Sequence, residues 1–243
     1  MKTTLSVILP AYNESGNIPV VVGSVMKAMA SMVDDYEIIV VDDGSTDSTG
    51  AVAGSLTKNG KVRVIHHTHN RGMGAAVRTG FKQARFELVI DIPADNQFDP
   101  LDIEALLKKN KETDADIVVG KRPKVKKPLM RRFYSNTNRM LLSLLYGLRI
   151  EDPTWVKLFK KNVFNTIKIE ADGFFWESEV LVKAKIAGLK IVSQEVGMHP
   201  RLLNQSKGNS LFRAIDVFLE MLKLWFKVRV LRKLYLAYED SIS

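Results

Sequence analysis

Hydrophobic and polar residues follow two alternating patterns along the first half of the chain. One pattern consists of short apolar runs rich in Val and Ile, typical of buried parallel strands, at residues 5–9, 37–41, 62–66, 87–92 and 116–119. In the other pattern apolar residues recur at helical spacing, at residues 17–33, 47–58, 74–84 and 101–110. Strands that alternate with helices across short connections predict right-handed βαβ units. We therefore predict an α/β fold with a mostly parallel sheet flanked by helices.

The C-terminal segment has a different pattern. Over residues 210–236, apolar side chains recur at helical spacing and basic side chains lie between them, which predicts an amphipathic helix. Two interpretations are open: the apolar face packs on the core, or the helix lies at a membrane surface with Trp225 and the basic residues at the lipid headgroups. We expect an α/β domain over residues 1–209, followed within residues 210–243 by a basic amphipathic helix that packs on the domain or on a membrane.

The predicted strands end in unusual polar segments. In an open α/β sheet, ligands bind at the carboxyl ends of the strands. One such end carries Asp42 and Asp43 and then turns through Gly44, since glycine adopts positive φ at little cost. Two adjacent carboxylates at this place can read a ribose or a base edge and help to hold a divalent cation. The alternative is a structural turn with solvated acids.

Two further loops follow strands of the predicted sheet. Residues 93–100 read PADNQFDP, in which Asp95 and Gln97 offer the oxygen ligands that Mg²⁺ or Mn²⁺ accepts, with phosphates completing the coordination. Residues 70–74 contain two glycines that permit a close backbone approach just before a helix. This second loop is not the dinucleotide-binding fingerprint, which would follow the first strand.

The net charge of +9 is unevenly distributed. Lysine and arginine crowd residues 121–132, and a second basic set lies near the C-terminus. Such charge attracts phosphate in nucleic acid, in anionic lipid or in a phosphorylated substrate, and the alternative is a solvated charged loop. A nucleic-acid binder is the least favoured class, because the chain has no recognisable binding module and no aromatic residues interleaved with the charges.

Composition also limits the compartment. The chain has no cysteine, which excludes disulfides and thiolate metal sites and suits a reducing compartment. No segment resembles a secretory leader, and the apolar stretch 140–148 is much shorter than the roughly 20 residues of a transmembrane helix. We expect a cytoplasmic protein, with peripheral attachment to the cytoplasmic face of the membrane as an open alternative.

Four motifs occur in order along the predicted sheet: PAYNE from residue 10, VVDDGSTD from residue 40, NRGMGAA from residue 70 and ADNQFDP from residue 94. Together they resemble the inverting family 2 glycosyltransferases with the GT-A fold, and within these the dolichyl- or polyprenyl-phosphate sugar (mannose or glucose) synthases. The resemblance continues through Gly120-Lys121-Arg122, Asp152-Pro153-Thr154 and residues 173–179 to the run 199–207.

The resemblance implies transfer of a hexose from a nucleotide sugar, of the GDP-mannose or UDP-glucose type, to a polyprenyl or dolichyl phosphate. It implies Mg²⁺ or Mn²⁺ as cofactor with Asp95 and Gln97 as ligands, and Asp95 and Arg122 as catalytic residues. The residues that it implies for the nucleotide sugar are Pro10, Ala11, Tyr12, Glu14, Asp42, Asp43, Ala94, Asp95, Gln97, Arg201 and Lys207. Those that it implies for the acceptor phosphate are Arg122, Arg131 and Ser135. Such an acceptor adds an anionic membrane surface as a partner, and no nucleic acid is expected.

Two positions depart from the family pattern. The first acid of the metal site, expected two residues before Asp95, is Pro93, although Asp91 lies nearby. After Asp152-Pro153-Thr154 the family usually continues Ser-Gly-Phe-Arg, whereas this chain continues with Trp155, Val156, Lys157 and Leu158. A differently built metal site and acceptor pocket are therefore expected.

The acceptor decides the mechanism. An ionised phosphate monoester attacks the anomeric carbon from the face opposite the nucleotide without a strong general base, and inversion follows. A sugar hydroxyl needs a carboxylate to take its proton, for which Asp95, Asp99 and Glu179 are the candidates. Transfer to such a soluble saccharide and a catalytically weak nucleotide-sugar binding protein remain the alternative functions.

Overall fold

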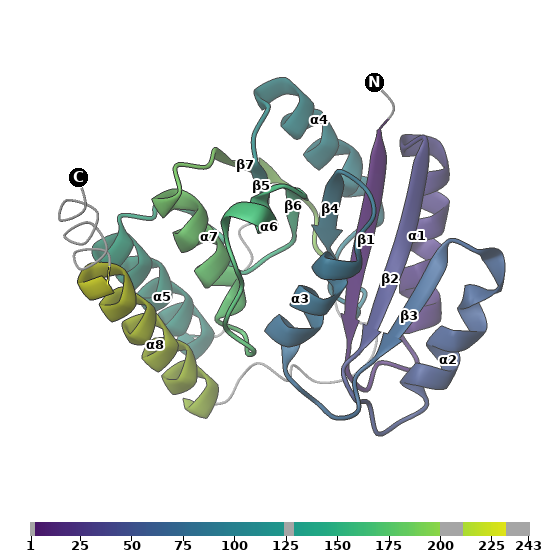
Figure 1. Ribbon diagram of the computed structural model, residues 1–243, viewed down its shortest axis with the longest axis horizontal. Helices are drawn as coiled ribbons and strands as arrows, with labels where there is room; N and C mark the ends of the chain where they lie inside the picture. The colour runs from purple at the N-terminus through teal and green to yellow at the C-terminus, as the bar shows by residue number, and fades with distance from the viewer. Residues whose placement is uncertain (1–2, 124–128, 200–210, 232–243) are drawn as a thin grey trace, which may run out of the picture. The chain divides into compact units, whose positions relative to one another are not determined.

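The computed structural model describes residues 3–123, 129–199 and 211–231. Among these, the side chains of residues 59, 129–134, 211–214 and 230–231 lie outside the description. The chain forms two compact units: residues 1–125 with 150–205, and residues 126–149 with 206–243. Figure 1 shows the elements in sequence order.

The first unit is built on one mixed sheet, seven-stranded in the described part of the chain, with the order β3-β2-β1-β4-β6-β5-β7. Its strands are β1 (Thr4–Ala11), β2 (Asp35–Asp42), β3 (Val62–His66), β4 (Leu88–Asp91), β5 (Ile117–Lys121), β6 (Lys157–Lys160) and β7 (Ile191–Glu195). All neighbours pair in parallel except β6, which is antiparallel to β4 and to β5. The predicted α/β class and its five strands are confirmed, and β6 and β7 are additional.

Helices cover both faces of this sheet (Figure 1). The helices of the first unit are α1 (Ile18–Met32), α2 (Thr49–Ser55), α3 (Met73–Gln83), α4 (Ile103–Thr113), α6 (Val163–Thr166) and α7 (Trp176–Ile186). Successive residues of a strand point to opposite faces, so Leu5, Val7 and Leu9 of β1 join the core cluster that contains α1. Ile8 faces the other way, where a Cβ on Gly80 of α3 would lie 2.3 Å from its Cγ2. Strand β1 is therefore buried on both sides.

Two predicted helices are interrupted at one end. The helix expected over residues 47–58 consists of the α-helix α2, which is followed directly by the 3₁₀ turn η1 (Leu56–Asn59). The helix expected from residue 101 begins with the 3₁₀ turn η2 (Pro100–Asp102), where Asp99 accepts a hydrogen bond from the Leu101 N–H. Such 3₁₀ turns are frequent at helix ends.

The second unit contains two helices, α5 (Leu129–Tyr146) and α8 (Leu211–Phe226), and α8 continues as the π-helical turn η3 (Lys227–Leu231). The Tyr146 hydroxyl donates to the Met221 carbonyl at 2.5 Å, which joins the two helices. Met221 and Leu224 are buried, whereas a second apolar stripe of α8 is exposed; its members are Ile215, Phe218, Leu219, Leu222 and Phe226. The predicted C-terminal helix is thus present, and its predicted part beyond residue 231 lies outside the described residues.

None of the helices in the described ranges has the length and apolar composition needed to span a membrane.

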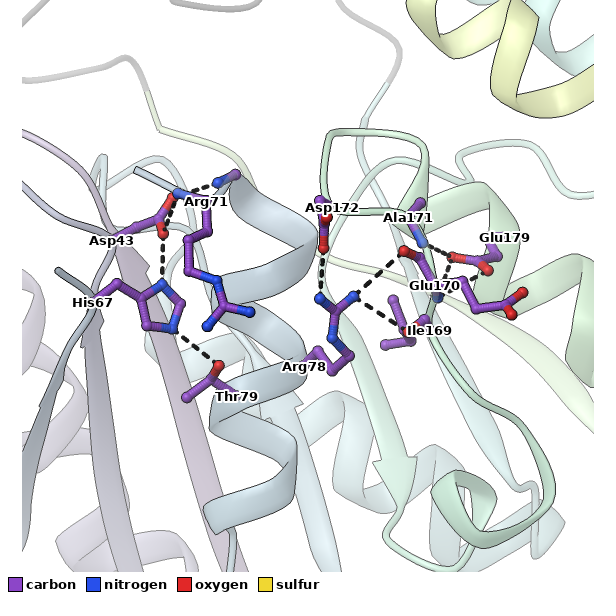
Figure 2. Close-up of polar contacts among 11 residues, drawn as sticks. Asp43, His67, Arg71, Arg78, Thr79, Ile169, Glu170, Ala171, Asp172 and Glu179 are labelled. Atoms are coloured by element: carbon purple, nitrogen blue, oxygen red, sulfur yellow. Dashed lines mark hydrogen bonds and ion pairs between the residues drawn. The ribbon is translucent and has the colours of Figure 1, made fainter. Parts of the chain in front are cut away.

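In the first unit, the loop before α7 docks on the N-terminal end of α3 (Figure 2). The Asp172 carbonyl accepts the N–H groups of Gly74 at 2.7 Å and Ala75 at 3.3 Å. The Arg78 guanidinium pairs with the Asp172 carboxylate at 2.5 Å and donates to the Ile169 carbonyl at 3.3 Å. The two bonds to the Asp172 carbonyl satisfy N–H groups of the kind that every helix leaves unpaired at its start.

The two glycines of this docking site have no room for a side chain. A Cβ on Gly74 would lie 2.1 Å from the Ala171 carbonyl oxygen, and a Cβ on Gly72 would lie 2.4 Å from that of Asp172. Gly72 also has φ +97, which disfavours other residues. The close approach that the sequence predicts before this helix is thus made by the chain itself.

The docking predicts a large effect of Gly74→Ala. Because the added Cβ meets backbone oxygens, the loop has to move, and we expect the free energy of unfolding to fall by roughly 2–4 kcal/mol. Urea denaturation measures this change. The matched control is Gly54→Ala in α2, where a Cβ meets nothing within 4 Å. An equal response of the two variants would contradict the docking.

Candidate functional site

The carboxyl ends of β1 and β2 form one side of the site. These strands pair in register, so Ala11 lies opposite Asp42, and the segment 10–14 lies beside the Asp42–Asp43 turn. Asn13, with φ +54, ties them together because its side chain accepts the Thr46 N–H at 2.8 Å. Pro10 and Ala11 are buried and Tyr12 is half-buried. The structure therefore brings together the nucleotide-side residues predicted from these two motifs.

Asp42 is buried and paired with groups of its own neighbourhood. Its carboxylate accepts the Ser45 N–H at 3.1 Å and contacts His66 Nδ1 at 3.0 Å. Burial raises the pKa of Asp42, but the hydrogen bonds from Ser45 and His66 outweigh it and hold the pKa below its ordinary value. The group is therefore an anion at neutral pH.

Asp43 organises the loop that leads into α3 (Figure 2). Its carboxylate accepts the N–H groups of Arg71 at 3.0 Å and Gly72 at 2.8 Å, and His67 Nδ1 lies 2.7 Å from it. The other ring nitrogen of His67 lies 3.0 Å from the Thr79 hydroxyl. Asp43 is thus engaged by its own chain, and its predicted contact with the nucleotide remains a prediction.

Glu14 has a similar local partner. Its carboxylate accepts the Asn17 side-chain N–H at 2.7 Å, and its backbone N–H donates to the Thr49 hydroxyl at 2.8 Å. These bonds fix the start of α1 against the start of α2. The predicted role of Glu14 at the nucleotide likewise remains a prediction.

The loop after β4 carries the predicted metal ligands. Asp95 and Ala94 are buried, Gln97 is half-buried, and Asp95 Oδ1 accepts the Gln97 N–H at 3.1 Å. His199 is placed against this loop: its N–H donates to the Gln97 carbonyl at 2.8 Å and its Nε2 lies 3.1 Å from Asp99. Asn96, with φ +60, makes the turn between the two candidate ligands.

Asp91, the acid nearest to Pro93, has another partner. It is buried and accepts the Lys157 N–H at 3.2 Å. Burial raises the pKa of Asp91 to about 6, although the Lys157 ammonium opposes this shift. Asp91 is therefore bonded to the main chain of β6 and interacts electrostatically with Lys157, and its part in the metal site remains a prediction.

The residues of this loop fit a divalent cation only if oxygen atoms of the substrate complete its coordination. Among the residues that the structure describes, no group of three His, Asp or Glu side chains is arranged to hold a metal. Mg²⁺ is usually bound by one or two carboxylates together with substrate phosphates. Asp95 and Gln97 match this arrangement.

Arg122 follows β5 and is held on three sides. Its guanidinium and the Asp152 carboxylate form two bonds, Nε to Oδ2 at 2.7 Å and Nη2 to Oδ1 at 2.5 Å. Nη2 also donates to the Thr154 hydroxyl at 3.1 Å, and the guanidinium lies 4.6 Å from the centre of the Trp155 ring. Within the described ranges, Nη1 has no hydrogen-bond partner. The guanidinium of Arg122 is thus fixed through Nε and Nη2, while Nη1 is not used in these bonds.

Glu177, in the first turn of α7, is a functional candidate that the sequence reasoning missed. Burial raises the pKa of Glu177 to about 7, with a contribution from Asp91, while Lys157 and Arg122 oppose the shift. A perturbed carboxyl beside two cations is typical of a functional site. The sequence signal that could have identified Glu177 is its position at the start of a helix. Glu179 shares this position, so the signal does not distinguish the two acids.

Glu179, one of the three acids that the sequence offers as proton acceptors, has structural contacts (Figure 2). Its carboxylate accepts the N–H groups of Glu170 at 3.0 Å and Ala171 at 2.9 Å and pairs with Lys183 at 2.6 Å. These contacts hold the loop that docks on α3. These contacts support the alternative that Glu179 is a structural acid, and its role as a proton acceptor remains an untested prediction.

Four predicted residues do not belong to the described part of the first unit. Arg201 and Lys207 are outside the described residues. Ser135 lies on α5 in the second unit, and Arg131 belongs to the same helix, its side chain being outside the description. Their roles at the acceptor and the diphosphate remain predictions.

The raised pKa of Glu177 predicts a pH-dependent stability. The folded state binds the proton more tightly than the unfolded state, whose pKa is near 4.5. This stabilisation is complete below pH 4.5 and is lost as the pH rises through about 7. As the pH rises from 4.5 to 8, we expect the free energy of unfolding of Glu177→Gln to increase by on the order of 1–3 kcal/mol relative to that of the parent chain.

Urea denaturation at both pH values measures this gain. Glu104→Gln, at an exposed position of α4, is the control and should follow the parent chain. A Glu177→Gln variant with the same pH dependence as the parent would overturn the assignment.

Relatives of the chain include lipid-phosphate sugar transferases. It is 30% identical over 227 residues to dolichol-phosphate mannosyltransferase from Pyrococcus furiosus, with 90% of this chain and 64% of that protein covered. It is 28% identical over 233 residues to dodecaprenyl-phosphate galacturonate synthase from Rhizobium johnstonii, with 93% and 67% covered. The chain thus spans about two thirds of the length of these curated relatives.

Solved structures share the fold. A crystal structure of glucosyl-3-phosphoglycerate synthase from Mycobacterium tuberculosis with phosphoglyceric acid has a TM-score of 0.73 and 22% identity, with 90% of this chain and 79% of that chain covered. A second structure of that enzyme, with Mn²⁺, UDP-glucose and phosphoglyceric acid, also has a TM-score of 0.73, at 21% identity, with 91% and 79% covered. At this identity the likeness shows the GT-A fold. The model of the family described as glycosyl transferase family 2 matches residues 6–177, and the chain belongs to that family.

Proposed function

We propose that this protein transfers a hexose from a nucleotide sugar to a polyprenyl phosphate with inversion at the anomeric carbon. The observation that carries the proposal is Arg122, a half-buried arginine whose Nη1 has no hydrogen-bond partner within the described ranges, next to β5 in the unit that holds Asp42 and Asp95. Family membership and the lipid-phosphate acceptors in the names of two relatives support it.

The donor would lie along the ends of β1, β2 and β4. Tyr12 and Asp42 would bind its base and ribose, together with the neighbouring residues of their motifs. Asp95 and Gln97 would hold Mg²⁺ or Mn²⁺ on the diphosphate. When bound, such an ion neutralises negative charge on the leaving nucleoside diphosphate. Arg201 and Lys207 would add positive charge to the same group.

The acceptor phosphate would bind Arg122, with Arg131 and Ser135 as further ligands. Because Asp152 and Trp155 already fix the guanidinium, little reorganisation accompanies binding. An ionised phosphate oxygen then forms a bond to the anomeric carbon as the bond from that carbon to the diphosphate oxygen breaks. The nucleoside diphosphate leaves with the electron pair, and no proton has to be removed.

A hydroxyl acceptor is the second candidate, and Glu177 is the observation that favours it. A carboxyl with a pKa of about 7 beside Arg122 is suited to take the proton of an attacking hydroxyl at neutral pH. The two acceptor classes are distinguished by direct assay.

The second unit suits a membrane surface. The exposed apolar stripe of α8 includes Phe218 and Phe226, and on α5 Met140 and Leu144 are exposed as well. Lys223, Lys227 and Arg229 of α8 and η3 add positive charge. Helices of this kind lie in the headgroup region of anionic membranes. We propose peripheral binding to an anionic membrane surface, where a polyprenyl phosphate is available.

The function is tested by sugar transfer. The protein is incubated with GDP-mannose or UDP-glucose and either a short polyprenyl phosphate or a simple sugar, with Mn²⁺ or with excess chelator. We expect transfer to the phosphate, dependent on the metal and reduced about 100-fold or more by Asp95→Asn. Asp91→Asn is the matched control, since that acid pairs with Lys157, and it should cost less than about tenfold. Full activity in chelator would exclude the metal, and transfer to the hydroxyl alone would exclude the phosphate acceptor.

Membrane binding is tested by sedimentation with vesicles. We expect binding to anionic vesicles at low salt, weakened by added salt because each basic residue contributes at most about 1 kcal/mol. Replacing Phe218 and Phe226 together with Ser should reduce this binding while the fold is kept. Leu101→Ser, at an apolar residue of the first unit that is 62% exposed, is the control. Equal binding by all variants would contradict the role of α8.

A further inference from the structure

Trp155 contacts two cations of the site, Arg122 and Lys157. Its carbonyl accepts a hydrogen bond from the Lys157 ammonium at 2.7 Å, and its ring lies under the Arg122 guanidinium, 4.6 Å from ring centre to Cζ. Its ring also meets Phe98 edge to face, with centroids 6.4 Å apart and an interplanar angle of 72°. Phe98 belongs to the loop that carries Asp95 and Gln97. Trp155 therefore lies between the proposed acceptor arginine and the proposed metal loop.

The indole of Trp155 is not explained by packing alone. The residue is 6% exposed, and its Nε1–H is buried without a hydrogen-bond partner among the described residues. A buried donor without a partner costs free energy, whereas a phenylalanine would bring no such donor. An indole also binds a cation on its face more strongly than a phenyl ring does. A phenylalanine at this position would therefore weaken the cation–π interaction with the Arg122 guanidinium.

The contacts around Arg122 show what the Trp155 ring adds to the hydrogen bonds of the guanidinium. Asp152 and Thr154 hold the edge of the guanidinium through Nε and Nη2. These hydrogen bonds lie in the plane of the guanidinium and fix the direction in which it points, but they restrict its tilt out of that plane less. The face of the Trp155 ring restricts this tilt. With both, the Nη1 group has one orientation.

We propose that Trp155 is a positioning residue of the acceptor subsite. This inference rests on the proposed function of Arg122. The Trp155 ring fixes the plane of the Arg122 guanidinium so that Nη1 meets a phosphate oxygen of the acceptor, and it couples this plane to the metal loop through Phe98. The ligand chemistry is a phosphate monoester.

The first test separates positioning from packing by steady-state kinetics of Trp155→Phe. We expect kcat/KM for a short polyprenyl phosphate to fall about tenfold, with the donor KM changed less than about twofold. The control is Phe164→Leu, because Phe164 stacks on Phe81 in the core and meets neither cation. The control should lower Tm without changing the acceptor KM.

Three results would overturn the proposal: an acceptor kcat/KM within about twofold of the parent chain, an equal loss for donor and acceptor, or an equal loss in the control.

A second test needs no turnover and uses the parent chain. The sequence has three tryptophans, so the indole N–H region of a ¹⁵N-correlated NMR spectrum holds three signals, and the one absent in Trp155→Phe is assigned to Trp155. Titration with the short polyprenyl phosphate should shift this signal in a saturable manner. Saturable binding that leaves the Trp155 signal unchanged would overturn the proposal. If the parent chain transfers no sugar but the signal shifts, the proposed function fails and the positioning of a phosphate subsite stands.

Discussion

The contact on which the first unit depends is the approach of the loop before α7 to two glycines at the start of α3. The Asp172 carbonyl takes two N–H groups of the helix, and neither Gly72 nor Gly74 leaves room for a Cβ. On its other side the loop is held by the Glu179 carboxylate. Because Asp43 fixes the segment that enters α3, hydrogen bonds run from the end of β2 to α7 without a break (Figure 2). The donor side of the sheet and the helix that carries Glu177 are thereby held in one body.

A second constraint is the cost of burying charge. Unpaired charges are expensive in a protein interior, and the buried cations of the site each have an acid and an aromatic ring. Arg122 has the Asp152 carboxylate and the Trp155 ring, and the Lys157 ammonium has the Trp176 ring and an electrostatic interaction with Asp91. Glu177 lies beside them, and burial raises its pKa although Lys157 and Arg122 oppose the shift. The arrangement gives fixed cations for anionic substrates and two carboxyls with raised pKa values, about 6 for Asp91 and about 7 for Glu177.

The sequence predicts those parts of the fold that local pattern determines. Apolar runs in regular alternation with helices gave five strands, and the motifs at their ends gave the edge on which Asp42 and Asp95 lie. Strand β6 was not predicted, because its lysines interrupt the apolar run and because Lys157, a residue usually exposed, is wholly buried. Its antiparallel pairing also departs from a simple βαβ order.

Long-range partners were beyond the reach of the sequence. Asp43 is adjacent to Asp42, yet its partners Arg71 and Gly72 are 28 and 29 residues away. Glu177 and Glu179 share one helical turn, and only the packing of the loop 169–172 shows which of them is engaged. Local spacing contains no information on such contacts.

Native-state hydrogen exchange tests most directly whether the docked loop joins the two sides of the site. The account predicts that the amides of Gly74, Glu170 and Ala171 exchange with a free energy close to that of Val40, a buried residue of β2. Val40 then serves as the internal reference for opening of the whole unit. Exchange of the three loop and helix amides at the rate of exposed backbone, while Val40 stays protected, would contradict the account.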